Sequence, residues 1–165
     1  MVKRIFDILF SIIGLIFFSP CFLLVSILIK ADSKGPVFFL QERVGRNGVL
    51  FKIIKFRSMI TDQNYNSTIT TANDNRITTI GKIIRKLKID ELPELLNILM
   101  GDMSFVGPRP ALFNQEDLIS LRKDCGVNKL LPGLTGWAQV NGRDNISIKR
   151  KVDFDAEYLH RKSFF

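Results

Sequence analysis

The chain has 165 residues, with 24 Lys and Arg against 16 Asp and Glu and a net charge of +8, which is enough length for one domain with a modest core. Two cysteines, Cys21 and Cys125, exclude a disulfide framework and favour a reducing compartment, and a single histidine, His160, excludes a zinc site built from histidines. Any bound metal is therefore expected to be a hard cation held by Asp or Glu.

An apolar run opens the chain. Residues 8–29 contain no charged residue and are as long as the ~20 residues of a membrane-crossing helix. A cleaved signal peptide is disfavoured, because the run is too long and no small-residue cleavage site follows it. A straight transmembrane anchor is one alternative, but Ser19 and Pro20 stand near the middle of the run. Proline removes a backbone hydrogen bond, and the Ser19 hydroxyl can compensate locally, so the pair predicts a bend.

Basic residues flank both ends of this run, with Lys3 and Arg4 before it and Lys30 and Lys34 after it. Positive charge marks the cytoplasmic side of a membrane segment, so both flanks favour the same side. We therefore expect residues 1–30 to form a re-entrant membrane anchor, helix-break-helix, that turns back at Ser19-Pro20. Residues 31–165 are expected to form a cytoplasmic catalytic domain.

Two strand-like runs follow in residues 37–56, and Asn47-Gly48 between them predicts a β-hairpin. Basic residues decorate the hairpin or follow it: Arg43, Arg46, Lys52, Lys55 and Arg57. They could form a solvated face or, for Lys55 and Arg57 in particular, contact a phosphate-bearing substrate.

A polar, turn-rich segment at 61–77 predicts a loop. After it, Ile80, Ile83, Ile84 and Leu87 are spaced as on one face of a helix, while lysines and Arg85 occupy the other faces. A basic amphipathic helix suits a phosphate-rich surface, although a solvated helix is the common alternative.

The next segment, KIDELPELLNILMGD, places two adjacent carboxylates, Asp90 and Glu91, just before Pro93. Proline favours the first turn of a helix, and Gly101 is a typical helix end. The apolar stripe is expected at Leu92, Leu95, Leu96 and Leu99. The two carboxylates could simply cap the helix, but one is enough for a cap.

Arg109 lies between Pro108 and Pro110, whose rings restrict the backbone on both sides. An arginine on a stiff loop loses little entropy when its planar fork binds a phosphate. Further on, a glycine-rich segment carries Trp137 and Arg143, and such loops can bring backbone N–H groups close to phosphates.

Together these features indicate phosphoryl transfer at a membrane surface. Asp90 and Glu91 could hold Mg²⁺ and supply a nucleophile, and the arginines could neutralise phosphate oxygens. The expected fold is α+β and helix-rich, with one β-hairpin and amphipathic helices behind the membrane anchor.

Three segments, FKIIKFRSM, IRKLKIDELPELLNILMGDMSFVGPRP and PGLTGWAQVNGR, closely resemble bacterial sugar transferases of the monotopic phosphoglycosyl transferase family. The resemblance implies transfer of a sugar 1-phosphate from a UDP-sugar to polyprenyl phosphate at the cytoplasmic face of the bacterial inner membrane. The products are polyprenyl diphosphate sugar and UMP, and Mg²⁺ is required. This is the first membrane step of glycan assembly.

The resemblance also implies residue roles. Asp90 is expected to be the nucleophile that forms a covalent phosphosugar intermediate, with Glu91 as its metal-binding or charge-managing partner. The remaining expected contacts to substrate and phosphate are Arg85, Arg109, Pro110, Arg143, Lys55 and Arg57. Ser19-Pro20 is expected to be the turn-back point of a re-entrant helix, and relatives of this kind are expected to continue for a few tens of residues beyond YLHRKSFF.

Two other functions are compatible with parts of the pattern. One is a membrane-anchored module that binds anionic lipid without catalysis, and the other is an enzyme that transfers the sugar alone and releases UDP. Nucleic acid is not expected as a partner, because aromatic residues do not cluster among the basic ones. The motifs carry no signal for one particular sugar or for an oligomeric state, and the loop 61–77 or the C-terminal region could read the sugar.

Overall fold

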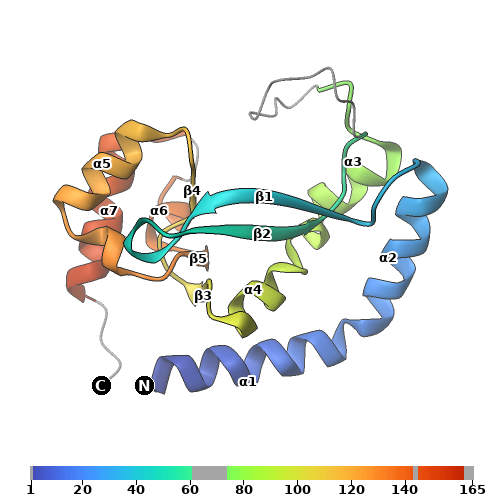
Figure 1. Ribbon diagram of the computed structural model, residues 1–165, viewed down its shortest axis with the longest axis horizontal. Coiled ribbons are helices and arrows are strands. Elements are labelled where there is room, and N and C mark those ends of the chain that lie inside the picture. Colours follow the sequence, from blue (N-terminus) through green and yellow to red (C-terminus); the bar gives the residue numbers. More distant parts are fainter. Residues whose placement is uncertain (1, 61–73, 143–144, 162–165) are drawn as a thin grey trace.

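The computed structural model describes residues 2–60, 74–142 and 145–161. The fold is helix-rich α+β, with a bent N-terminal helix pair along one side of a small sheet and the C-terminal helices gathered at the far end of the sheet (Figure 1). In chain order the elements are α1 Val2–Phe17, α2 Ser19–Asp32, β1 Phe38–Val44, η1 Arg46–Gly48, β2 Leu50–Phe56, α3 Thr79–Lys86, η2 Ile89–Glu91, α4 Glu94–Met100, β3 Ser104–Val106, β4 Ala111–Leu112, α5 Glu116–Asp124, η3 Val127–Lys129, β5 Gly133–Thr135, α6 Trp137–Val140 and α7 Ile148–Arg161.

The predicted bend at Ser19-Pro20 is confirmed. Helices α1 and α2 meet at 60°, and Pro20 stands in the first turn of α2. Proline cannot donate to the carbonyl four residues earlier, which is that of Ile16. The Ser19 hydroxyl donates to this same carbonyl at 2.8 Å, so the freed acceptor finds a local partner. In the part of the chain that the structure describes, no single helix is long and apolar enough to span a membrane, but the bent pair passes that test jointly.

The inner side of α1 is polar and is attached to the rest of the fold. Arg4 donates to the carbonyls of Ile98 and Leu99 at the C-terminal end of α4, where cations are favoured. Asp7 is buried and accepts from the Phe105 backbone N–H, and Lys3 donates to the Val106 carbonyl at 2.6 Å. The outer side of α1 exposes apolar residues, so the helix separates a protein-facing side from an apolar side.

The predicted hairpin is confirmed. β1 and β2 pair antiparallel from Phe38↔Phe56 to Val44↔Leu50, and the turn carries Asn47 at φ 57° and Gly48 at φ 82°. β4 adds to the other edge of β1, so the sheet order is β2-β1-β4, and β3 and β5 form a separate parallel pair.

One face of the hairpin packs on α4, and its open end packs on α2 and α3. Ile53 is buried with Leu95 and Ile98 of α4. Phe56 is buried with Ile29 of α2 and Ile84 of α3.

The apolar faces predicted for the two middle helices are partly wrong. On α3, Ile84 is buried, but Ile83 and Leu87 are 52% and 60% exposed. On α4 the fully buried face comprises Glu94, Leu95, Asn97 and Ile98, whereas Leu92, Leu96 and Leu99 are half-buried.

Asn97 explains much of the difference on α4, because its side chain makes two backbone contacts with β2. Its Oδ1 accepts from the Ile54 N–H at 2.9 Å, and its Nδ2 donates to the Lys52 carbonyl at 2.8 Å. The polar face of α4 therefore turns toward the strand.

Candidate active site

The two adjacent carboxylates lie in a short turn of their own. α3 ends at Lys86, Lys88 takes a left-handed conformation at φ 60°, and η2 then carries Asp90 and Glu91 ahead of Pro93. α4 begins only at Glu94, and no side chain of the described residues caps its N-terminus by a hydrogen bond. The geometry therefore does not favour the alternative in which the carboxylates are helix caps.

Glu91 is held by two of the cations that the sequence singled out. Lys55 of β2 contacts its Oε1 at 3.0 Å, and Arg109 contacts the same oxygen at 3.2 Å. Burial alone would raise the pKa of Glu91, but the charges and hydrogen bonds of Lys55 and Arg109 outweigh it and lower the pKa to about 2. Glu91 is therefore a fixed anion in the site.

Asp90 has a different environment. Burial raises the pKa of its carboxyl group, opposed by the positive charges of Lys55, Lys88 and Arg85 and reinforced by Glu91. Desolvation is the largest cause of this shift, and it depends on the folded structure rather than on the neighbouring residues in sequence. The Oδ1 of Asp90 is buried and has no hydrogen-bond partner among the described residues.

Two further charged residues belong to the cluster and were not predicted as site residues. Glu94 is 1% exposed and contacts Lys55 at 3.0 Å, so Lys55 bridges Glu91 and Glu94. Arg43 of β1 donates to the Pro110 carbonyl and to Gln41, and burial, followed by the charge of Arg109, lowers the pKa of Arg43 to about 10. The hairpin alternation that puts Arg43 and Lys55 on one face was the available signal.

The loop that carries Arg109 is held by its carbonyl groups. The Pro108 carbonyl accepts from the Gly133 N–H, the Arg109 carbonyl from Arg122, and the Pro110 carbonyl from Arg43. Donors from three separate segments therefore fix three consecutive residues, and Arg109 is presented to Glu91 from a rigid loop.

Glycines of the segment 131–142 pack closely against this loop. A Cβ on Gly133 or on Gly136 would lie within 2.1 Å of a backbone atom of Gly107. Only glycine permits this approach, so these two glycines serve backbone packing. That finding differs from the predicted use of the segment as a phosphate cradle.

The structure places the remaining predicted residues as follows. Arg85 is half-buried at the end of α3 and acts on Asp90 through its charge. Arg57 is 2% exposed and donates to the carbonyls of Ser33 and Lys34, so it does not join the cluster around Glu91. Pro110 is buried beside Arg109, and Arg143 lies outside the described residues.

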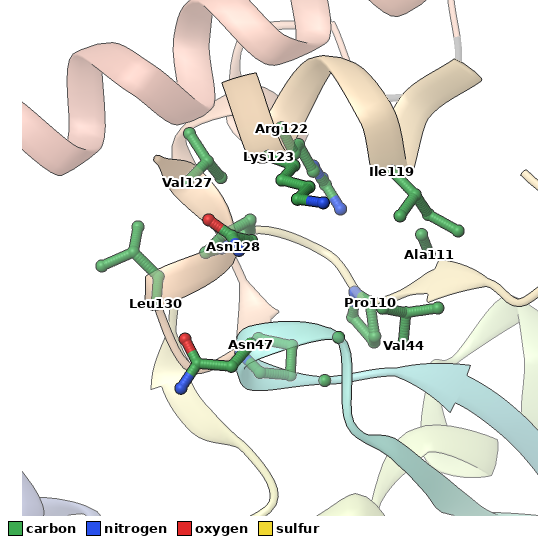
Figure 2. A pocket seen from close by; sticks show the side chains of 14 residues that line it. Val44, Asn47, Pro110, Ala111, Ile119, Arg122, Lys123, Val127, Asn128 and Leu130 are labelled. Atoms are coloured by element: carbon green, nitrogen blue, oxygen red, sulfur yellow. The ribbon is translucent and has the colours of Figure 1, made fainter. Parts of the chain in front are cut away.

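Two cavities lie near these elements. A shallow one of ≈ 220 Å³ borders Glu91 and is lined by Lys88, Leu134, Thr135, Gln139 and Val140 as well. A larger one of ≈ 290 Å³ lies between the hairpin turn and α5, with Val44, Pro110 and Ile119 in its wall (Figure 2). Val44 lines the larger cavity, and its neighbour Arg43 points to the opposite face of β1, which it shares with Lys55. Because Lys55 contacts Glu91, the larger cavity lies across the sheet from the carboxylates.

The whole chain, residues 1–165, matches the family model described as bacterial sugar transferase. The chain belongs to the bacterial sugar transferase family.

Curated relatives of this family cover the chain almost completely. The exopolysaccharide production protein ExoY of Rhizobium meliloti is 40% identical over 100% of this chain and 80% of its own length. The uncharacterized sugar transferase EpsL of Bacillus subtilis is 41% identical over 100% of this chain and 81% of its own length. The UDP-glucose:undecaprenyl-phosphate glucose-1-phosphate transferase of Escherichia coli is 38% identical over 99% of this chain, which spans 37% of that protein.

The acidic residues of this bacterial sugar transferase define what metal it could hold. Within residues 2–60, 74–142 and 145–161, no group of three or more His, Cys, Asp or Glu is arranged to hold a metal ion. Mg²⁺ commonly needs only one or two protein carboxylates, because water and substrate phosphates complete its shell. The buried Oδ1 of Asp90, which no described residue hydrogen-bonds, and the anionic Glu91 fit that requirement.

Proposed function

We propose that this protein transfers a sugar 1-phosphate from a UDP-sugar to polyprenyl phosphate, giving polyprenyl diphosphate sugar and UMP. The observation that carries the proposal is the asymmetry of the two carboxylates. Glu91 is neutralised by Lys55 and Arg109, whereas Asp90 makes no ion pair within the described residues. Curated relatives named for this reaction, such as the Escherichia coli protein, support the substrate classes.

In the proposed first step, a carboxylate oxygen of Asp90 attacks the β-phosphorus of the UDP-sugar. A new bond joins that oxygen to phosphorus, and the bond from phosphorus to the bridging oxygen breaks, so UMP leaves with the bonding electrons. Asp90 suits attack because no cation of the described residues holds its lone pairs in an ion pair. Arg109 and Lys55 lie where they can balance charge on phosphate oxygens, and Glu91 keeps both in place.

In the second step, an oxygen of polyprenyl phosphate attacks the same phosphorus. The bond to Asp90 breaks, the carboxylate is regenerated, and the product is polyprenyl diphosphate sugar. Asp90 and Glu91 are the residues that would hold Mg²⁺. When bound there, the ion would supply charge neutralisation on the transferring phosphate.

The helix pair is proposed to insert into the cytoplasmic leaflet and leave on the side it entered. Large apolar side chains on both helices are exposed, including Phe17 at 74% and Leu23 at 66%. Both ends of the pair are attached to the same globular part, α1 through Lys3 to the Val106 carbonyl and the segment after α2 through Arg57 to the Lys34 carbonyl. An anchor held at both ends by one domain supports a re-entrant path, and the proposed location of the reaction is the cytoplasmic face of the inner membrane.

Product identity tests the proposal. Purified protein is supplied with Mg²⁺, polyprenyl phosphate and a panel of UDP-sugars, and the released nucleotide is separated by chromatography. UMP is the expected product. Release of UDP would contradict the proposal and indicate transfer of the sugar alone, and no nucleotide release across the panel would favour a lipid-binding module.

A further inference from the structure

Lys88 stands in a backbone conformation that is unfavourable for its residue type. Its φ is 60°, and within the described residues only Asn47 shares a positive φ without being glycine. Lys88 follows the end of α3, the position where helices usually place glycine or asparagine. A lysine in the left-handed region is strained, and strained backbone positions cluster at functional sites.

The side chain of Lys88 lies beside the carboxylates and makes no ion pair within the described residues. It lines the ≈ 220 Å³ cavity together with Glu91, and its charge acts on Asp90. Among the described residues no side chain or carbonyl forms an ion pair or a hydrogen bond with its ammonium group, whereas Lys55 and Arg109 are both engaged by Glu91. Lys88 is therefore a cation at this cavity that no carboxylate of the described residues holds in an ion pair.

The chemistry of the cavity selects the ligand class. An ammonium group offers three donors and a full charge, which suit a phosphate oxygen. The cavity is smaller than the ~300–1,000 Å³ of a site for a whole drug-sized ligand, so it fits one portion of a substrate.

We propose that Lys88 binds a substrate phosphate group in the cavity beside Glu91. The inference rests on the proposed function, and the phosphate belongs either to the donor diphosphate or to the polyprenyl phosphate acceptor. Lys88 occupies a glycine position because its charge is needed there, so its removal should cost activity without costing stability.

Three variants of Lys88 separate the effect of its charge from the effect of its backbone conformation. Lys88→Gln removes the charge, Lys88→Arg keeps it, and Lys88→Gly removes both the charge and the strain. We expect Lys88→Gln and Lys88→Gly to lower kcat/KM for UMP release by about tenfold, and Lys88→Arg to recover most of it. Lys88→Gly should nevertheless keep or raise the Tm, because glycine takes this φ without cost.

Two matched controls belong to the test. Lys86→Gln removes an equal charge from an exposed position of α3 outside the cavity. Asn47→Gly relieves the other positive φ, far from the carboxylates on the hairpin turn. Both should keep wild-type kcat/KM.

Separate titrations of the two substrates assign the phosphate. A higher KM for the UDP-sugar in Lys88→Gln assigns the donor diphosphate, and a higher KM for polyprenyl phosphate assigns the acceptor. Turnover within twofold of wild type for Lys88→Gln, or a loss that Lys88→Arg does not restore, would overturn the inference.

Binding measurements test the role of Lys88 even if the protein does not catalyse the proposed reaction. If wild-type protein releases no UMP from any UDP-sugar, calorimetric titration with UDP and with polyprenyl phosphate still tests Lys88. Weaker binding of one of these probes by Lys88→Gln, but not by Lys86→Gln, is then the supporting result. Equal binding by both variants would overturn the inference.

Discussion

Asp90 and Glu91 are neighbours in sequence with opposite electrostatic conditions. Glu91 shares one oxygen between Lys55 and Arg109, and its pKa falls to about 2. Asp90 is desolvated, which raises its pKa, and one of its oxygens is buried with no hydrogen-bond partner among the residues that the structure describes. When two neighbouring carboxylates have different roles in catalysis, their environments usually shift their pKa values in opposite directions.

Asp90→Asn is expected to abolish formation of a covalent adduct while leaving the fold intact, because an amide is not a competent nucleophile and Asp90 makes no ion pair within the described residues. The protein is incubated with Mg²⁺ and an accepted UDP-sugar, polyprenyl phosphate is omitted, and intact mass reports an added sugar phosphate. Glu91→Gln is the matched comparison. It should slow the reaction or weaken its metal dependence without moving the attachment point. Full turnover by Asp90→Asn would rule out the covalent route.

The sequence identified the site residues around Asp90 and Glu91 only where neighbouring residues in the chain gave the signal. Asp90, Glu91 and the Pro108–Pro110 restriction of Arg109 could be read from adjacent residues, and the structure brings Arg109 to Glu91. Glu94 and Arg43 were missed because the contacts that bring them to the site join distant parts of the chain, Glu94 to Lys55 and Arg43 to Pro110, which is 67 residues away. Arg57 was grouped with Lys55, but β2 ends at Phe56 and the chain there turns toward α2.

At the scale of elements, the junction of α1 and α2 depends on one hydroxyl. The Ser19 Oγ occupies the Ile16 carbonyl that Pro20 leaves without a backbone donor. Ser26 makes a similar contact to the Phe22 carbonyl at 2.6 Å, but no proline withholds the backbone donor there. The two serines are thus chemically alike, and only Ser19 replaces a missing donor.

Ser19→Ala is therefore expected to destabilise the protein by about 1 kcal/mol, and Ser26→Ala much less. In a Pro20→Ala background the difference should shrink, because residue 20 then donates to Ile16 itself. Thermal unfolding in detergent, followed by the fluorescence of the single Trp137, measures the effect of each serine change in the wild-type and Pro20→Ala backgrounds. Equal effects of the two serine changes, or an unchanged Ser19 effect without proline, would show that the hydroxyl does not support the bend.

At the scale of the whole molecule, helix α1 belongs both to the proposed anchor and to the globular fold. Its inner face contacts α4 and β3 through Arg4 and Asp7, while its outer face is apolar and exposed. The sequence indicated the apolar run and its break, but it gave no sign that one side of α1 would pack on the segment 98–106, because that contact joins distant parts of the chain.

Both ends of the helix pair should therefore be accessible from the cytoplasmic side alone. Cys21 and Cys125 are replaced by serine, and single cysteines are introduced as Val2→Cys and Lys34→Cys, which leaves the Lys3 contacts intact. An impermeant thiol reagent applied to inverted and right-side-out vesicles should label both positions only in inverted vesicles. Labelling of the two positions from opposite sides would show that the pair spans the membrane.

Asn97 has a consequence for association between copies of this protein. β2 is at one edge of the sheet, and an open edge is a template on which a second chain can pair as a strand. The Asn97 amide bonds one N–H and one carbonyl of that edge, much as a neighbouring peptide group would. The helix that follows the two carboxylates thus also blocks intermolecular strand pairing, so α4 protects the protein from edge-to-edge aggregation.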